Sequence, residues 1–154
     1  MFSRILVSLL SLSLFLPIYS EEIEEIVVTA LKRSSTVADT PASITAISST
    51  EIEDKGITDM HDLKHMVPSM NFTNVLGAQN ITIRGIGQFN GNPGVSVSTD
   101  GVFQSRAHSS QLGEMDLERV EVLRGPQGTL YGRNSIGGVV NLITKNPSQD
   151  RDGY

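Results

Sequence analysis

Residues 118–145 constrain the fold of this chain more than any other stretch. They contain an alternating strand pattern over residues 119–123, a glycine-rich loop that carries arginines, and a second strand pattern over residues 139–144. Alternation with a period of two is typical of a half-buried strand, and glycines mark the turns between such strands. The stretch therefore predicts a strand, a loop and a second strand that follow one another directly.

Two short helices are expected upstream of this unit, after a strand at residues 42–48. Ser49 or Thr50 is the expected N-cap of the first helix, and Gly56 is expected to end it. The second helix is expected over residues 59–66, because apolar residues there recur at helical spacing. The residues that share this apolar face are Met60, Leu63 and Val67.

Strand patterns dominate the middle of the chain, where glycines separate short alternating runs. Strands are expected over residues 71–76, 80–84 and 95–100, and the Asp100-Gly101 pair is expected to form a tight turn. Residues 31–40 are polar and small, and they are interpreted as a linker. Two small helices and several short strands together predict an α+β domain with a small mixed β-sheet.

The first 20 residues are expected to form a secretory signal peptide that is not part of the fold. Arg4 supplies a positive charge, residues 5–18 form an apolar run, and Ser20 places a small residue at a plausible cleavage point. The apolar run is shorter than the ~20 residues that cross a bilayer as a helix, so a signal peptide is preferred to a membrane anchor. The chain is therefore expected to be exported.

Charge and cysteine content argue against two classes of protein. The formal net charge of −5 disfavours binding to nucleic acid. The chain has no cysteine, so it does not belong with the small exported domains that disulfide bonds stabilise. Its stability is expected to come from a small core of packed side chains.

Four segments carry motifs that occur together in one protein family. Residues 25–30 end in Ile-Val-Val-Thr-Ala, and residues 80–87 end in Arg-Gly-Ile-Gly. Residues 123–133 contain Arg-Gly-Pro-Gln-Gly, and residues 137–145 read Gly-Gly-Val-Val-Asn-Leu-Ile-Thr-Lys. In this order, they resemble the TonB box, the central strand end, the Arg-Gly-Pro loop and the closing strand of a plug domain. The family is that of the TonB-dependent outer-membrane receptors of the iron-complex or siderophore type.

The resemblance implies a division of the chain into four parts. Residues 1–20 would be the signal peptide, 21–32 the TonB-box-like periplasmic segment with its linker, and 33–147 the plug domain. Residues 148–154 would lead into the first strand of a transmembrane β-barrel, which the chain lacks. The chain is therefore expected to be a fragment of a longer receptor. The alternatives are a stand-alone periplasmic module that binds a ligand or TonB without transport, and an inactive remnant.

The resemblance also implies partners and a location. TonB, driven by its inner-membrane energising complex, would grip one short strand, and the receptor's own β-barrel would surround the plug. The plug would gate the uptake of an iron–siderophore complex through the outer membrane, whereas the chain expressed alone would lie in the periplasm. The expected TonB-binding residues are Glu25, Ile26, Val27, Val28, Thr29 and Ala30.

Two loops that are rich in amide and hydroxyl groups are candidates for the ligand site. Such groups hydrogen-bond a polar iron chelate, and in the family the apical loops of the plug form the floor of the extracellular ligand site. The alternative is that both loops are plain solvated turns. The candidate residues are Gln88, Phe89, Asn90, Arg106, His108 and Ser109.

Arg84 and Arg124 each end an alternating pattern and precede a glycine. An arginine at the rim of a sheet presents a planar fork that suits a carboxylate on a facing wall. The resemblance implies contacts between plug and barrel there, with Arg133, Glu118 and Glu121 in the same set. Glu118 and Glu121 are also the local carboxylates that could pair with Arg84 and Arg124. The alternative is an exposed arginine whose surface ion pair contributes little.

No catalytic residue or metal ligand is expected, and the chain is expected to be neither an enzyme nor the carrier of a covalent cofactor. His61 and His65 are four residues apart on the second expected helix, but no third ligand is evident. Asp100, His108 and Ser109 supply the residue types of a catalytic triad, but nothing orients them. The glycine-rich loop lacks the Gly-Lys-Ser/Thr sequence of a phosphate-binding loop.

Overall fold

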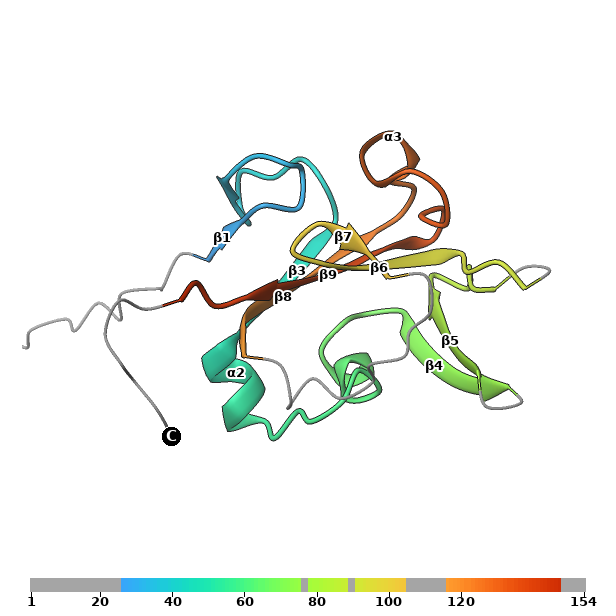
Figure 1. Cartoon of the computed structure of the whole chain (residues 1–154), viewed down its shortest axis with the longest axis horizontal. Helices are drawn as coiled ribbons and strands as arrows, with labels where there is room; N and C mark the ends of the chain where they lie inside the picture. The colour runs from blue at the N-terminus through green and yellow to red at the C-terminus, as the bar shows by residue number, and fades with distance from the viewer. Residues whose placement is uncertain (1–25, 76–77, 89–90, 105–115, 148–154) are drawn as a thin grey trace, which may run out of the picture.

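A five-stranded mixed sheet forms the centre of the protein. The computed structural model describes residues 26–75, 78–88, 91–104 and 116–147 (Figure 1). The sheet has the strand order β3-β8-β9-β6-β7, in which β6 and β9 are parallel and the other neighbours antiparallel. Its strands are β3 (Ile44–Ser48), β6 (Val95–Thr99), β7 (Val102–Phe103), β8 (Leu117–Arg124) and β9 (Gly138–Thr144). The prediction of an α+β fold with a small mixed sheet is confirmed.

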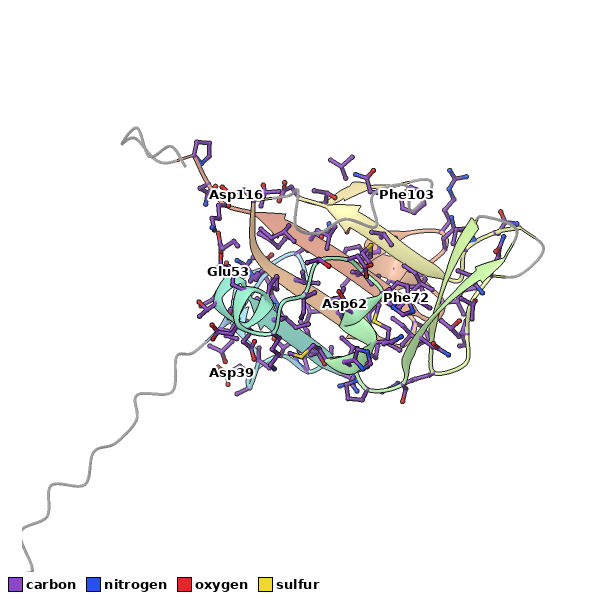
Figure 2. The ribbon with its side chains drawn as sticks, turned by 90° about the horizontal axis from the view of Figure 1, so that it is seen from below. Asp39, Glu53, Asp62, Phe72, Phe103 and Asp116 are labelled. Carbon is purple, nitrogen blue, oxygen red and sulfur yellow. The ribbon has the colours of Figure 1, made fainter. Side chains whose placement is uncertain are left out.

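One face of this sheet carries the main apolar core. It is covered by two short helical elements and a separate hairpin, which lie in front of the sheet when it is seen from below (Figures 1 and 2). These elements are α2 (Ser49–Asp54), the 3-10 helix η1 (Asp62–His65), β4 (Met70–Val75) and β5 (Ala78–Ile83). The sheet residues that meet them are Val95, Val97, Val120, Val122, Val140 and Leu142, all buried. They alternate along their strands, as a half-buried sheet requires.

The opposite face is covered by residues 26–40 and by the short helix α3 (Gly128–Tyr131). Residues 26–40 form a hairpin of two short strands, β1 (Val27–Val28) and β2 (Ser35–Thr36). The structure corrects the prediction of a linker at residues 31–40, because this stretch turns back and pairs with β1. The buried side chain of Thr40 and its hydrogen bond to the Thr36 carbonyl close the hairpin.

The first helix begins one residue earlier than predicted. Ser48 is the N-cap, since its hydroxyl accepts from the Glu51 amide while the Glu51 carboxylate accepts from the Ser48 amide. This reciprocal capping box satisfies two amides that the helix leaves free. Gly56 follows the last turn with a φ of 60°, so the prediction that it ends the helix is confirmed.

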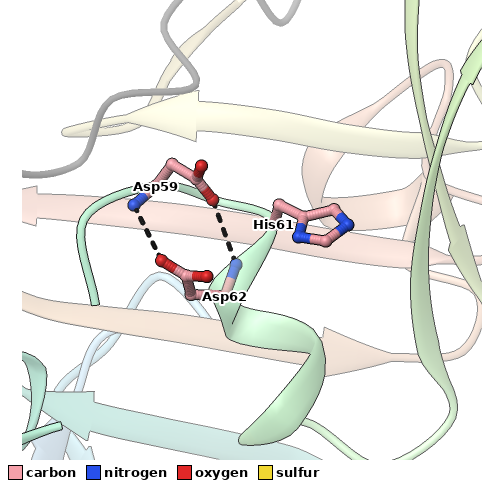
Figure 3. Close-up of side chains that lie close together, drawn as sticks. All are labelled: Asp59, His61 and Asp62. Carbon is pink, nitrogen blue, oxygen red and sulfur yellow. Dashed lines mark hydrogen bonds between the residues drawn. The ribbon is translucent and has the colours of Figure 1, made fainter. Parts of the chain in front are cut away.

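The second predicted helix is shorter and tighter than expected. Instead of an α-helix over residues 59–66, the chain forms only η1, because a reciprocal turn occupies the residues before it. The Asp62 carboxylate accepts from the Thr58 and Asp59 amides, and the Asp59 carboxylate accepts from the Asp62 amide (Figure 3). The predicted apolar face is nevertheless confirmed. Its three residues, Met60, Leu63 and Val67, are buried in the main core.

The predicted tight turn at Asp100-Gly101 joins β6 to β7. Both residues have positive φ, 49° and 81°, as a two-residue hairpin of this kind requires. The Asp100 carboxylate accepts hydrogen bonds from the amide and hydroxyl of Thr144, which ties the turn to the end of β9. No helix among the described residues combines the length and hydropathy needed to span a membrane.

Candidate functional site

The N-terminal segment (residues 26–30) lies on the sheet rather than free. Val27 and Val28 pair with Thr36 and Ser35 of β2. Val28 and Ala30 are fully buried, in a second apolar cluster that is completed by Ile44, Leu123 and Val139 of the sheet. Val27, by contrast, is 50% exposed. Glu25, the first residue of the predicted TonB-binding set, lies outside the described residues.

A buried carboxylate holds the end of this segment. Glu121 of β8 is fully buried, and its Oε1 accepts a hydrogen bond of 2.8 Å from the Thr29 amide. The same oxygen accepts from Arg119 Nε at 2.8 Å and from the Thr29 hydroxyl at 3.4 Å. The other oxygen, Oε2, accepts from Asn141 Nδ2 at 3.5 Å, and Ser98 donates to Asn141 in turn at 2.8 Å. A connected polar network therefore lies beneath the segment, beside the apolar cluster.

Tyr131 of α3 clamps the segment from the other side. Its hydroxyl donates to the Ala30 carbonyl at 2.7 Å, and Lys32 Nζ lies 4.5 Å from the centre of its ring. Burial and, to a smaller extent, the nearby charge of Glu121 raise the pKa of Tyr131 to about 12. Both causes favour the neutral hydroxyl, which is the form that donates the hydrogen bond.

An open pocket of about 380 Å³ adjoins the segment. It lies between residues 29–34, the β6–β7 turn, α3 and β9. Its lining is polar and mixed in charge, and it consists of Thr29, Lys32, Arg33, Ser34, Asp100, Gly101, Tyr131, Asn141 and Ile143. The pocket lets solvent reach the side of the segment while the sheet side stays covered.

Arg84 and Arg124 meet at one end of the sheet. Arg84 lies in the turn after β5 with a φ of 53°, and its Nη2 donates to the Ser43 hydroxyl at 3.2 Å. The Arg124 amide donates to the Ser43 carbonyl at 2.9 Å, so Ser43 joins the two residues. The Nε of Arg124 is buried without a hydrogen-bond partner in the described part of the chain. Two guanidinium groups therefore lie at the same rim.

The two local candidates for partners, Glu118 and Glu121, do not pair with these arginines in the structure. Glu118 and Glu121 both form their ion pairs with Arg119, not with Arg84 or Arg124. Glu121 is enclosed by its own chain, so its carboxylate does not face outward. Within the described ranges, none of Arg84, Arg124 and Arg133 pairs with a carboxylate. Arg133 is exposed, with its guanidinium 6.0 Å from the centre of the Phe103 ring.

Glycines hold the two arginine loops together. The Gly125 amide donates to the Gly137 carbonyl at 2.9 Å, and the Gly137 amide donates to the Gly94 carbonyl at 2.8 Å. A Cβ at Gly138 would lie 2.3 Å from the Leu123 carbonyl oxygen, which is closer than real contacts allow. In the structure, Gly137 and Gly138 pack against their own chain, and so fix the rim on which the arginines lie.

The predicted ligand loops are described only in part. Gln88 is exposed, and its backbone amide donates to the Asn80 side-chain oxygen at 2.9 Å. Phe89, Asn90, Arg106, His108 and Ser109 lie outside the described residues.

One cluster has the residue types of a metal site. The ligand atoms of Asp59, His61 and Asp62 lie within 4.8 Å of one another (Figure 3). The carboxylates already accept the backbone hydrogen bonds of the turn before η1, and the bond from the Thr58 amide is the main cause that lowers the pKa of Asp62. His61 contacts Lys64 and lies 6.0 Å from the Phe72 ring. The two carboxylates lie close together because both accept backbone hydrogen bonds in this turn.

Three features of the site were not predicted from the sequence: β2, the role of Arg119, and the clamp by Tyr131. The alternation of β8 did contain a signal for Glu121. It places a carboxylate between the buried residues Val120 and Val122, on the face that it shares with Leu123. A charged residue inside such a strand needs partners in the fold. No local pattern identifies those partners, because Thr29 is 92 residues away in sequence.

The comparisons with known proteins identify the family. Residues 36–139 match the family described as TonB-dependent Receptor Plug Domain. The pesticin receptor of Yersinia pestis is 37% identical over 134 residues, which cover 84% of this chain and 20% of that protein. The iron-regulated outer membrane virulence protein of Vibrio cholerae is 34% identical over 138 residues, covering 84% of this chain and 21% of the relative. The chain belongs to the family of TonB-dependent receptor plug domains.

Solved structures agree with this assignment. The ferric yersiniabactin uptake receptor of Yersinia pestis superimposes with a TM-score of 0.64 at 35% identity, over 71% of this chain and 18% of the receptor. The ferric-catecholate import receptor of E. coli K12 does so with a TM-score of 0.64 at 32% identity, over 82% of this chain and 18% of that one. The chain thus spans about a fifth of the length of the relatives that it matches. The two solved structures are described as an uptake receptor and an import receptor.

Proposed function

We propose that this chain is the plug part of an outer-membrane receptor that takes up a ferric siderophore, or a similar iron complex, with energy from TonB. The observation that carries the proposal is the plug-family match over residues 36–139. The names of the relatives support iron as the cargo, since they include a ferrioxamine B receptor and a ferric yersiniabactin uptake receptor. The proposed location is the outer membrane, after export directed by residues 1–20.

Energy would enter through the N-terminal segment. Strand addition joins an extended peptide to the edge of a partner's sheet through backbone hydrogen bonds. The segment suits this mode, because β1 is already extended and Val27 is exposed. TonB would pair with residues 26–30, and a pull on them would act on the sheet through β1. The region 33–147 would then shift as the plug and admit the ligand.

The arginine rim would face the receptor's barrel. Arg84 and Arg124 have no carboxylate partner among the described residues, and Arg124 Nε is buried without an acceptor. A buried donor without an acceptor is costly, so a carboxylate on a facing wall would stabilise this end of the plug. The outward-facing candidates for such contacts are Arg84, Arg124, Arg133 and Glu118.

The ligand would bind on the loops that follow β5 and β7. Amide, hydroxyl and cationic side chains there suit a polar, negatively charged chelate. The proposed contacts are Gln88, Phe89, Asn90, Arg106, His108 and Ser109.

The test is to replace Ile26 by Pro in the receptor that contains this chain. Proline removes a backbone donor and disrupts strand pairing, so we expect co-purification with the TonB C-terminal domain and iron-chelate uptake to fall by roughly tenfold or more. Ile26→Val keeps the strand, and we expect it to leave both measurements unchanged. Uptake that survives Ile26→Pro would contradict the assignment of the segment. TonB binding without uptake in the unaltered protein would favour a stand-alone module.

A further inference from the structure

We propose that Glu121 is a latch that controls access of a partner strand to the N-terminal segment. In the latched state, Glu121 accepts a hydrogen bond from the Thr29 backbone amide, which an incoming strand would otherwise bind. In the released state, that amide is free and residues 26–30 leave the sheet. The identity of the partner rests on the proposed function, whereas the latch is defined by contacts within this chain.

The first step concerns the Thr29 amide. Backbone amides point to alternate edges along an extended strand, so those of Val28 and Thr29 point in opposite directions. Val28 pairs with Ser35 of β2, while the Thr29 amide donates to Glu121 Oε1 at 2.8 Å. The first backbone amide after β1 is therefore bonded to a carboxylate and not to β2. A partner strand must displace Glu121 before it can bind this amide.

The second step concerns how Glu121 is held. Arg119 donates its Nε to the same carboxylate oxygen at 2.8 Å, its Nη1 to Glu118, and its Nη2 to the Thr29 hydroxyl at 3.3 Å. The Arg119 side chain is 11% exposed and that of Glu121 is fully buried. A charge-assisted hydrogen bond in such a setting is stronger than a neutral one. Arg119 thus both orients the carboxylate and contacts the segment.

The third step concerns the strength of the remaining contacts. β1 and β2 are two residues long each, and an isolated two-stranded hairpin is marginal in water. The fully buried apolar side chains of the segment are only Val28 and Ala30. Because this apolar contact is small, the polar contacts of Glu121 and Tyr131 are a large share of what keeps the segment on the sheet.

The sheet face beneath the segment is suited to release. Beside the small apolar cluster of Ile44, Leu123 and Val139, it carries Ser96, Ser98, Asn141 and Glu121, which water can solvate once the segment has left. The opposite face carries valine and leucine at the equivalent alternating positions of the same strands. Exposure of the polar face leaves less apolar surface in water than exposure of the other face would.

The test uses the absence of cysteine from the natural chain. Ala30→Cys places a single thiol where the native side chain is fully buried, and its maleimide labelling in cell envelopes reports release of the segment. We expect Glu121→Gln to accelerate this labelling roughly ten- to hundredfold, the factor that one charge-assisted hydrogen bond supports. The matched control is Glu118→Gln, which also removes a carboxylate from Arg119 but touches no residue of the segment.

A second reporter separates release from unfolding. Val140→Cys lies in the main core, and it should stay unlabelled when Glu121→Gln is present. Equal acceleration at positions 30 and 140 would overturn the latch, because Glu121 would then support the whole fold. No acceleration at position 30, or the same acceleration in Glu118→Gln, would also overturn it.

A third variant keeps the carboxylate in place. Tyr131→Phe removes only the hydrogen bond to the Ala30 carbonyl, and it should accelerate labelling at position 30 by a few-fold. TonB binding is measured in parallel on the same envelopes. Release without TonB binding would support the latch and contradict the proposed partner, whereas TonB binding with unchanged labelling would contradict the latch alone.

Discussion

The two faces of the central sheet are held in different ways. On one face, valines and leucines of β6, β8 and β9 pack against α2, η1 and the β4–β5 hairpin. On the other, a small apolar cluster holds Val28 and Ala30, and Glu121 bonds the Thr29 amide within a network that also includes Ser98 and Asn141. The same strands supply both faces, because alternate residues point to opposite sides.

The difference shows how one small domain can combine a fixed part with a removable part. Apolar burial is non-directional and grows with area, so it stabilises the covered face as a whole. A few hydrogen bonds to one carboxylate are local, and they can break without disturbing the rest. A segment that must leave the sheet is therefore best held by a small apolar contact and a few polar ones, and residues 26–30 are held in this way.

The largest expected effect comes from the apolar face. Leu142→Ala removes a side chain buried in the main core, and it should lower the free energy of unfolding by about 2–5 kcal/mol. Urea unfolding followed by circular dichroism measures this change. The control Leu130→Ala alters a side chain that is 42% exposed on α3, so it should change the free energy by less than about 0.5 kcal/mol. Equal losses in both variants would show that the apolar face is not the main source of stability.

A smaller effect is expected from Tyr131 at high pH. Its pKa is raised to about 12 from the ordinary value of 10.0, so the folded protein binds this proton more tightly than the unfolded chain does. The resulting stabilisation is fully present below pH about 10 and is lost as the pH rises towards about 12. A titration of tyrosine absorbance should therefore show a late phase that Tyr131→Phe abolishes. A late phase that persists in this variant would belong to another tyrosine.

Spacing patterns among residues that are close in sequence predicted much of the apolar face. The alternation of strands β8 and β9, the helical spacing of Met60, Leu63 and Val67, and the turn at Asp100-Gly101 all depend on neighbouring residues. The errors arose where side chains compete for local backbone groups. The expected cap of the first helix is Ser49 or Thr50, whereas Ser48, the last residue of β3, caps α2, and Asp59 and Asp62 form a turn where a longer helix is expected.

The polar face could be predicted only in outline. The motif at residues 25–30 indicated a strand, but nothing nearby indicates that it folds back against β2 or that Glu121 receives it. The contacts that hold it join residues about 90 to 100 positions apart, as Thr29 with Glu121 and Ala30 with Tyr131. Hydrophobic spacing does not encode such pairs. A carboxylate at a buried position indicates that it needs a partner, but not which residue that partner is.

Hydrogen exchange of the native chain tests the difference between the two faces most directly. Amides of the N-terminal hairpin, above all that of Thr29, should exchange through local opening, roughly a hundredfold or more faster than those of Val140 and Leu142 in β9. That result would show a removable segment on a fixed sheet. Exchange of both sets at one common rate, governed by global unfolding, would contradict the account.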